Sequence, residues 1–425
     1  MTRIYRFLRG TSSLTAWENR DGVRESLSVL RAKSVKMIAS MIALTASRLY
    51  TPLDCLEQPL LLVDGDAIVE VSSRTAREVP AGTQTTDYGD ATLAPGFVDI
   101  HIHGGAGHDV MNADTAGLAA MERLLAAHGV ASYFPTTVTA PVDQTLSALD
   151  RLASAIEQAE QARAEGHAQP LGIHLEGPFI SHLRRGVHPP ANLLRPTLEM
   201  FDRFWQAARG RLRMMTIAPE LEGAKEVIAE AARRGVCVSL GHSNADLNAT
   251  RAGVAAGASH CTHGFNAMRP LDHREPGIIG AMLTDSRLSA DIIADGIHLD
   301  PIIVQLFVEA KGPDAAVLIT DATAATGMPD GHYRLGSLEV EVKDGRCMSE
   351  GRLAGSVLTM DRAVRNVMQF AGWDLQQALR PASLNPARIT GLAGRGKLEA
   401  GCKADIVVLT PAGEVRATMV RGAIC

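Results

Sequence analysis

The middle of the chain, from about residue 95, alternates short apolar runs with longer segments whose apolar positions recur at helical spacing. The apolar runs predict eight β-strands, at residues 97–103, 131–138, 171–179, 213–219, 236–242, 259–265, 288–294 and 315–321. Helical patterns fill several of the gaps, at residues 116–128, 144–161, 224–234, 246–256 and 301–311. Eight strand–helix units in succession predict an α/β fold with a TIM-like (β/α)8 barrel over residues 95–392. On periodicity alone, an open doubly wound sheet is the alternative.

Both ends of the chain carry a β pattern instead. Residues 60–63 and 67–71 are apolar runs separated by the turn Asp64-Gly65-Asp66, which predicts a hairpin. Residues 404–409 and 415–420 repeat this arrangement near the C-terminus. The simplest organisation is one small β-sandwich built from both chain ends, residues 41–94 and 393–425, around the inserted barrel.

The first forty residues differ from the rest of the chain. They are rich in arginine, which is typical of a transit peptide, but acidic residues interrupt the pattern. The apolar run at 37–46 resembles a signal-peptide core, although it lies late and continues into a predicted strand. We therefore expect residues 1–40 to be a poorly ordered extension, with Met37 and Met41 as alternative translation starts.

Composition narrows the class of protein. The 425 residues are 46% hydrophobic and carry a net charge of −5, which favours a globular protein without a nucleic-acid or membrane partner. The six cysteines form no C-x-x-C pair, and their scattered spacing indicates reduced thiols and a cytoplasmic location.

Titratable residues fall at the ends of the predicted strands. They are His101 and His103 on the first strand, Glu176 on the third, His242 on the fifth, His263 on the sixth and Asp321 on the eighth. Because the carboxyl ends of barrel strands meet at one mouth, we expect these side chains to converge there.

Each of these residues has an ordinary explanation when taken alone. An H-x-H pair such as His101 and His103 is a weak metal signal, His242 could lie in a turn, and Asp321 could cap a helix. Glu176, among apolar residues, needs a partner, and a cation is the favoured one. A single metal site explains all of these residues together more simply than a separate cause for each residue does. The joint pattern therefore predicts a metal site.

Several motifs occur in a fixed order along the chain. They are Pro-Gly-Phe-Val-Asp-Ile-His-Ile-His-Gly (95–104), His-Leu-Glu-Gly-Pro-Phe (174–179), Gly-His-Ser-Asn-Ala (241–245), Thr-His-Gly-Phe-Asn-Ala-Met (262–268), Ala-Asp-Gly-Ile-His (294–298) and Leu-Ile-Thr-Asp-Ala (318–322). In this order the chain resembles the N-acetylglucosamine-6-phosphate deacetylases of the amidohydrolase superfamily. The resemblance extends from about residue 42 to the C-terminal strands.

The resemblance implies a metal centre. Glu176, His242 and His263 would hold the principal ion, and His101 and His103, with Glu176 bridging, would hold a second. One or two divalent ions per subunit are therefore expected. Imidazole and carboxylate ligands suit zinc best, with iron, manganese and cobalt as alternatives.

The resemblance also implies the catalytic and substrate-binding residues. Asp321 would take the proton from the attacking water and deliver it to the leaving amine, while His188 would stabilise the carbonyl oxygen. His174 also matches the family, and we interpret it as a supporting or structural residue. The sugar phosphate would be bound by Arg274 and His298 and by backbone amides near Asn266 and Ala267. In relatives this arginine can act across a subunit interface, which predicts a homodimer.

The expected reaction is hydrolysis of the acetamide of N-acetyl-D-glucosamine 6-phosphate, in amino-sugar catabolism or cell-wall recycling. A deacetylase for the galactosamine epimer is an alternative, because the sequence does not reveal how one inverted hydroxyl is recognised. A cyclic-amide amidohydrolase is another, although such enzymes usually bridge two metals with a carboxylated lysine. Here Glu176 occupies that role and no lysine matches. A non-catalytic scaffold would have no need of the ligand set.

Overall fold

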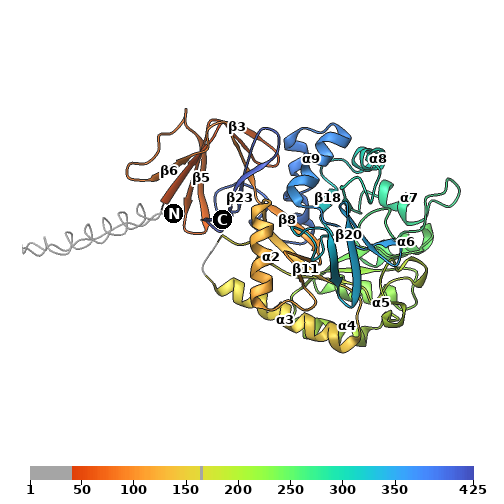
Figure 1. Ribbon diagram of the computed structural model, residues 1–425. Helices are drawn as coiled ribbons and strands as arrows, with labels where there is room; N and C mark the ends of the chain where they lie inside the picture. Colours follow the sequence, from red (N-terminus) through yellow and green to blue (C-terminus); the bar gives the residue numbers. More distant parts are fainter. Residues whose placement is uncertain (1–40, 163–165) are drawn as a thin grey trace, which may run out of the picture.

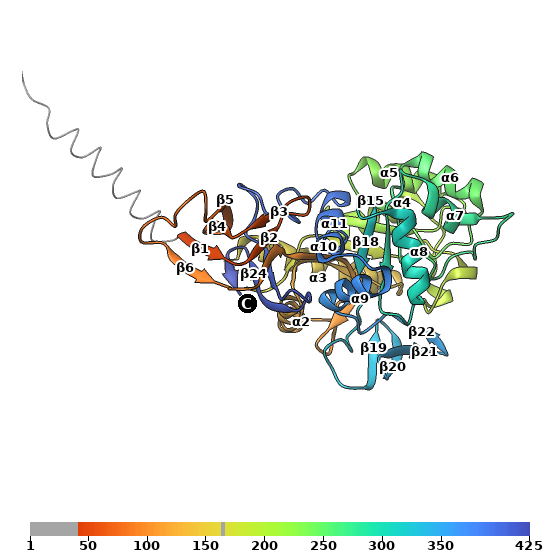
Figure 2. The same ribbon diagram turned by 90° about the horizontal axis from the view of Figure 1, so that it is seen from above.

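The computed structural model describes residues 41–162 and 166–425, and the extension expected at residues 1–40 lies outside this part of the chain. A large α/β body lies beside a smaller β region, and the first described strand and the C-terminus both belong to the β region (Figure 1). The view from above shows the same two parts, with the β region at one end of the molecule (Figure 2).

Eight parallel strands form the centre of the α/β body. In chain order they are β8 (Phe97–Ile102), β11 (Val130–Thr137), β13 (Ile173–Glu176), β14 (Leu212–Ile217), β15 (Cys237–Leu240), β16 (His260–Cys261), β17 (Ala290–Ile293) and β18 (Ala316–Ile319). Each strand pairs with the next along the chain except β16 and β17, which are linked by a hydrogen bond from the Ser289 amide to the Ser259 carbonyl. A parallel bridge between Ile102 and Ala322 connects the last strand's end to the first. The strands therefore curl into a TIM-like barrel.

The barrel strands read as continuous apolar runs because each is buried on both faces. Nearly all of their residues are inaccessible to solvent, since side chains fill the interior and helices cover the outside. Each strand overlaps one of the eight apolar runs, so the α/β barrel is the better interpretation of the periodicity, and the open sheet is wrong. A two-residue strand, β12 (Gln169–Pro170), extends the sheet beside β11.

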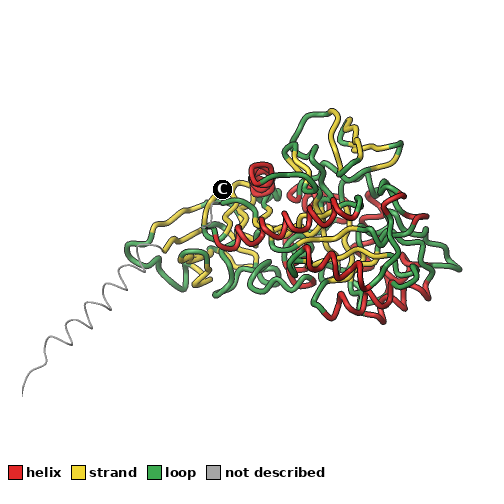
Figure 3. The backbone as a smooth tube through the Cα atoms, turned by 90° about the horizontal axis from the view of Figure 1, so that it is seen from below, coloured by secondary structure: helices red, strands yellow, loops and turns green. Residues whose placement is uncertain are grey.

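Helices surround the strands (Figure 3). They are α2 (Thr115–Ala127), α3 (Val142–Gln161), α4 (Leu198–Ala207), α5 (Ala224–Arg233), α6 (Leu247–Ala256), α7 (Gly277–Thr284), α8 (Pro301–Lys311), α9 (Met360–Ala371), α10 (Leu375–Leu379) and α11 (Leu384–Ile389). The side chains of Asp114, Asp246 and Asp300 cap α2, α6 and α8 by accepting a first-turn amide, which explains where these helices begin. The five predicted helices correspond to α2, α3, α5, α6 and α8.

The β region contains two sheets, and the larger one combines strands from both ends of the chain. One has the order β5-β4-β1-β6, and the other has the order β25-β24-β23-β7-β2-β3. The strands are β1 (Met41–Thr45), β2 (Arg48–Tyr50), β3 (Cys55–Glu57), β4 (Pro59–Asp64), β5 (Ala67–Ser73), β6 (Gln84–Asp87), β7 (Thr92–Pro95), β23 (Ile406–Leu409), β24 (Val415–Val420) and β25 (Ala423–Ile424). The two predicted hairpins are β4–β5 and β23–β24, both antiparallel. Leu44, Leu61, Ile406 and Val408 share one buried cluster, so both chain ends contribute to a common core.

A small antiparallel sheet is inserted between β18 and α9, and the sequence analysis did not predict it. Its strands are β19 (Gly331–Leu335), β20 (Leu338–Lys343), β21 (Arg346–Ser349) and β22 (Arg352–Leu353). We refer to β19–β22 as the cover sheet. Figure 2 shows it beside the barrel strands and α9. Its apolar residues Leu335, Val340 and Val342 pack in one cluster with Val138, which follows barrel strand β11.

Two predictions from the sequence concern membrane partners and the state of the cysteines. In the described part of the chain, no helix has the length and apolarity needed to cross a membrane. All six cysteines are free thiols, as their scattered spacing indicated.

Candidate metal-binding active site

A cavity of about 210 Å³ opens where the carboxyl ends of the barrel strands meet. The loop between β13 and α4, which contains the 3-10 turns η1 (His182–Arg184) and η2 (Pro190–Asn192), contributes Gly186, Val187 and His188 to its lining. The antiparallel pair β9 (Gly104–Gly105) and β10 (His108–Asp109) follows His103 along the chain. Most of the predicted site residues line the cavity: His103, Glu176, His188, His242, His263, Asn266, Ala267, His298 and Asp321. His101 lies fully buried beside His103, and Arg274 does not line the cavity.

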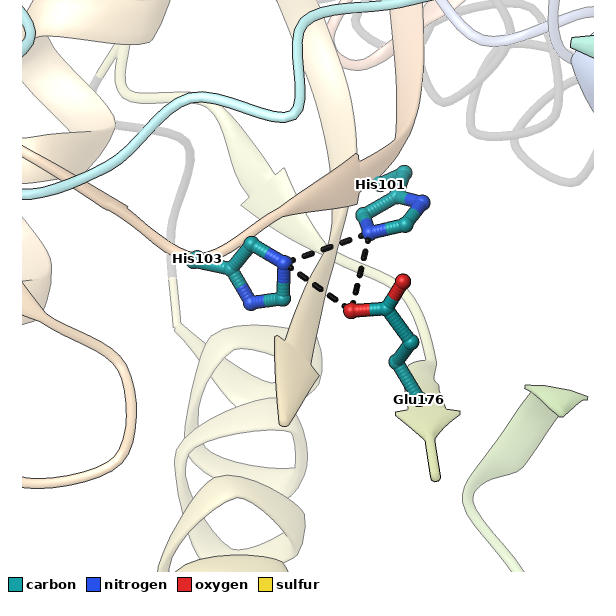
Figure 4. A group of neighbouring side chains, drawn as sticks. All are labelled: His101, His103 and Glu176. Carbon is teal, nitrogen blue, oxygen red and sulfur yellow. Dashed lines mark hydrogen bonds and ion pairs between the residues drawn. The ribbon is translucent and has the colours of Figure 1, made fainter. Parts of the chain in front are cut away.

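Glu176 is the centre of the site. Its Oε1 lies 3.0 Å from Nε2 of His263 and 3.2 Å from Nε2 of His242. Its Oε2 lies 3.2 Å from Nε2 of His103 and 3.5 Å from Nε2 of His101. Figure 4 shows His101, His103 and Glu176 pointing toward one another from the ends of β8 and β13, the two strands that flank β11. The five residues form two groups of three that share Glu176, with the ligand atoms of each group within 4.8 Å of one another.

The local backbone explains these directions. His101 and His103 are two residues apart on an extended segment, so both side chains lie on the same face. Nδ1 of His103 donates to the carbonyl oxygen of Thr136 at 2.9 Å, and Nδ1 of His242 donates to that of Arg184 at 2.9 Å. A carbonyl oxygen only accepts, so these contacts leave the Nε2 lone pairs facing the Glu176 carboxylate.

This arrangement fits a metal ion. The Nε2 atoms of His242 and His263 lie 3.1 Å apart and both face the Glu176 carboxylate, so positive charge, from protons or from a metal ion, stabilises these close contacts. Burial lowers the pKa of His103, but hydrogen bonds to Asp321 and Glu176 raise it well above its usual value. The site thus attracts positive charge. The donors are imidazoles and a carboxylate, which suit zinc and related divalent ions.

Buried polar residues outside the cavity hold the ligands in place. The Asp291 carboxylate accepts the backbone amide of His263 and also lies 2.8 Å from Nε2 of His260. His174 lies between the Ile100 carbonyl, at 3.1 Å, and the Thr216 hydroxyl, at 2.8 Å. Burial lowers the pKa of His174 well below its usual value, so its ring is neutral. His174 is therefore a neutral ring held by two hydrogen bonds behind the ligands, which agrees with a supporting position.

Asp321 follows β18 with a left-handed backbone, φ 49°, a conformation that aspartate tolerates better than most residues. Its amide donates to the His101 carbonyl at 2.9 Å, and its Oδ1 lies 3.2 Å from Nε2 of His103. Burial would raise the pKa of Asp321, but His101 and His103 lower it to about 2. The carboxylate is therefore ionised and can accept a proton inside the cavity.

His188 reaches the cavity from the loop that contains η1. Its Nδ1 lies 3.3 Å from the amide nitrogen of Thr139 and 2.7 Å from the Thr139 hydroxyl. An amide can only donate, so Nδ1 accepts and the ring proton lies on Nε2, which is 3.7 Å from Oε2 of Glu176. Burial and the neighbouring His242 lower the pKa of His188 to about 3, so the ring is a neutral Nε2–H donor.

The glycine of the His-Leu-Glu-Gly-Pro-Phe motif makes room for this contact. Gly177 has φ 71°, and a side chain there would collide with the Thr139 hydroxyl. Sequence reasoning identified His188 by resemblance but missed Thr139 and Asp291. Thr139 immediately follows the predicted second strand, and its partner is 49 positions away, so no local pattern marks it.

At the other side of the cavity, His298 is held by Asp295, whose Oδ2 lies 2.8 Å from Nδ1 of the ring. Asn266 and Ala267 lie on the left-handed turn after β16, where φ of Ala267 is 50°. Arg274 is exposed on the segment before α7, which extends away from the barrel in both views (Figures 1 and 2). Within one chain the structure does not bring Arg274 to His298.

Comparison with known proteins identifies the family of this chain. The sequence model of the amidohydrolase family matches residues 92–425. An N-acetylglucosamine-6-phosphate deacetylase from Bos taurus is 40% identical over 376 residues, which cover 85% of this chain and 90% of the relative. An N-acetylgalactosamine-6-phosphate deacetylase from Escherichia coli O157:H7 is 39% identical, covering 81% of this chain and 90% of the relative.

A solved structure extends the similarity to three dimensions. It is a variant of N-acetyl-D-glucosamine-6-phosphate deacetylase from Mycobacterium smegmatis in complex with N-acetyl-D-glucosamine-6-phosphate. It superposes with a TM-score of 0.84 at 38% identity, and the match covers 91% of this chain and 99% of that one. The chain therefore belongs to the amidohydrolase family and, within it, to the N-acetylglucosamine-6-phosphate deacetylases.

Proposed function

We propose that this protein hydrolyses the acetamide of N-acetyl-D-glucosamine 6-phosphate to glucosamine 6-phosphate and acetate. The observation that carries the proposal is the buried Glu176 carboxylate, which faces four imidazoles beside an ionised Asp321 in one cavity. The relatives named above, which match most of the chain, support the substrate class.

The metal ligands follow from the two groups that share Glu176. Glu176, His242 and His263 would hold the principal ion, and His101 and His103 would hold a second. One or two divalent ions per subunit fit this set, with zinc favoured over iron, manganese and cobalt. A bound divalent ion polarises the amide carbonyl and makes water a better nucleophile near neutral pH.

Two residues of the chain move or donate protons. The Asp321 carboxylate accepts the proton of the attacking water and later delivers it to the departing amine nitrogen. The Nε2–H of His188 donates a hydrogen bond to the carbonyl oxygen as negative charge develops there. The low pKa of the His188 ring, about 3, suits this role, because the neutral ring keeps one fixed donor.

The phosphate would lie at the side of the cavity formed by Asn266, Ala267 and His298. On its own chain Arg274 is exposed and does not line the cavity, so we assign the contact to a homodimer in which Arg274 of the partner subunit completes the site. Arginine suits this contact because its planar guanidinium meets phosphate oxygens with two parallel hydrogen bonds.

We assign the enzyme to the cytoplasm, in amino-sugar catabolism or cell-wall recycling, which agrees with its six free thiols. The corresponding division of the chain is a barrel at 95–392 and a β-sandwich formed by 41–94 and 393–425. The core shared by both chain ends supports this division.

The galactosamine epimer is the second candidate substrate, because one relative of 39% identity carries that name. Acetate release from N-acetylglucosamine 6-phosphate, N-acetylgalactosamine 6-phosphate and both unphosphorylated sugars separates the candidates. We expect the highest kcat/KM with the phosphorylated gluco sugar. A higher value with the phosphorylated galacto sugar would reverse the assignment, and no preference for phosphate would move the substrate to another amide.

A further inference from the structure

The cover sheet contributes apolar side chains to the active-site cavity. Leu335, the last residue of β19, and Leu353, on β22, line the cavity together with Val138 from the loop after β11. Leu335 and Val138 are 3% and 2% exposed and belong to one packed cluster. They form an apolar wall on a cavity whose other lining is mostly imidazole and carboxylate.

The wall lies beside the residues that act on the amide. Val138 immediately precedes Thr139, which holds His188 by two hydrogen bonds. If the proposed function is correct, the scissile carbonyl lies between His188 and Asp321, and the phosphate lies toward His298. The acyl substituent of the carbonyl carbon then faces the wall and not the sugar.

Two contacts keep the wall in place. The Asp109 carboxylate accepts the amide of Gly336, which follows Leu335 in the β19–β20 turn. This turn packs closely on the wall, since a Cβ on Gly336 would lie 2.6 Å from Cγ1 of Val138. At the other edge, the Arg352 guanidinium donates to the Gly186 carbonyl at 2.8 Å, in the loop that carries His188.

The geometry points to a specificity role that rests on the proposed function: Leu335 and Val138 limit the acyl group that this enzyme removes to about two carbons. A cavity of about 210 Å³ is small beside the ~300–1,000 Å³ of most ligand sites, so a longer acyl chain would have to displace these packed side chains. The substrate class is therefore short N-acyl amino-sugar phosphates, formyl and acetyl above all.

The test is a series of N-formyl, N-acetyl, N-propionyl and N-butyryl glucosamine 6-phosphates. In the wild type, each added methylene beyond acetyl should lower kcat/KM by roughly 10–200-fold. Leu335→Ala opens the wall and should raise the propionyl-to-acetyl ratio of kcat/KM by at least about tenfold. Leu335→Phe narrows the cavity and should lower the kcat/KM for the N-acetyl substrate relative to that for the N-formyl substrate. If Leu335→Ala does not fold, Val138→Ala enlarges the cavity from the barrel side and should raise the same propionyl-to-acetyl ratio of kcat/KM.

Val340→Ala is the matched control. Val340 is fully buried in the cover sheet and in the same cluster, but it does not line the cavity, so its variant should keep the wild-type acyl ratios. Unchanged ratios in both Leu335→Ala and Val138→Ala would overturn the inference, as would equal changes in Val340→Ala. Absence of hydrolysis of every member of the series by metal-loaded wild type would instead reject the proposed function.

Discussion

Two hydrogen bonds join Thr139 to His188: the backbone amide lies 3.3 Å from Nδ1 of the imidazole, and the hydroxyl lies 2.7 Å from the same atom. Together they fix the proton on Nε2, where it can meet a carbonyl oxygen. Thr139→Val removes the stronger contact and leaves the amide. Because one hydrogen bond contributes ~0.5–1.5 kcal/mol, we expect kcat to fall by roughly 2–10-fold with KM nearly unchanged.

Thr139→Ser is the control, since it keeps the hydroxyl and should restore kcat. A merely structural role predicts a different outcome for Thr139→Val, namely a lower melting temperature with wild-type kcat in the folded fraction.

Glu176 supplies the carboxylate common to both ligand groups. Glu176→Gln retains the size of the side chain but removes its charge, so tightly bound metal and activity should be lost together. Elemental analysis after gel filtration measures the metal content. The exposed Glu226→Gln variant on α5 is the control and should keep both. Full metal content in Glu176→Gln would require a different ligand set.

Much of the barrel and site could be predicted because the signals are local. Each barrel strand is a short apolar run, and His101, His103, Glu176 and Asp321 follow or end such runs. The cover sheet carries an equally clear alternation at residues 338–343, where β20 forms, but it interrupts the strand–helix succession and was not predicted. Sequence-based prediction identified the chemistry more easily than the walls of the cavity.

The residues that hold the ligands could not be predicted, because their partners are distant in sequence. Asp291 acts on the amide of His263, and Thr139 acts on His188, so each role exists only after folding. For Arg274 the sequence implies a role that the structure of a single chain does not show. The resemblance assigns it a function, but a single chain leaves it exposed.

A subunit-mixing experiment tests whether Arg274 acts across a dimer interface. In a symmetric dimer with exchanged arginines, mixing Arg274→Ala subunits with Asp321→Asn subunits gives a mixed dimer in which one site has an intact Asp321 and an intact arginine. Activity should therefore rise above that of either variant after subunit exchange. If Arg274 acts within its own subunit, the mixture should show only the sum of the two separate activities.

Glu122 on α2 predicts how stability depends on pH, away from the metal site. Burial raises the pKa of Glu122 to about 7, while Tyr133 donates a hydrogen bond to its Oε1 at 2.9 Å. The folded protein therefore keeps a proton that the unfolded chain releases, and stability falls as pH rises from the ordinary value of 4.5 to about 7. Glu122→Gln keeps the acceptor for Tyr133 and removes this loss.

Melting temperatures at pH 4.5 and pH 8 measure the effect. The gain in melting temperature of Glu122→Gln over wild type should be about zero at pH 4.5 and clear at pH 8, because only the wild type loses stability as Glu122 ionises. An equal gain at both values would mean that Glu122 does not titrate in this range.

We expect the Glu176 cluster, with Asp321 as proton acceptor, to hydrolyse the acetamide of N-acetylglucosamine 6-phosphate. The most direct measurement is the rate of acetate and glucosamine 6-phosphate formation by zinc-reconstituted wild type, metal-depleted wild type and zinc-reconstituted Asp321→Asn. We predict equal amounts of both products from the first, none from the second, and a kcat roughly 10²–10⁴-fold lower in the third at matched zinc content. Undiminished turnover in the metal-depleted enzyme or in Asp321→Asn, or no acetate from reconstituted wild type, would contradict the account.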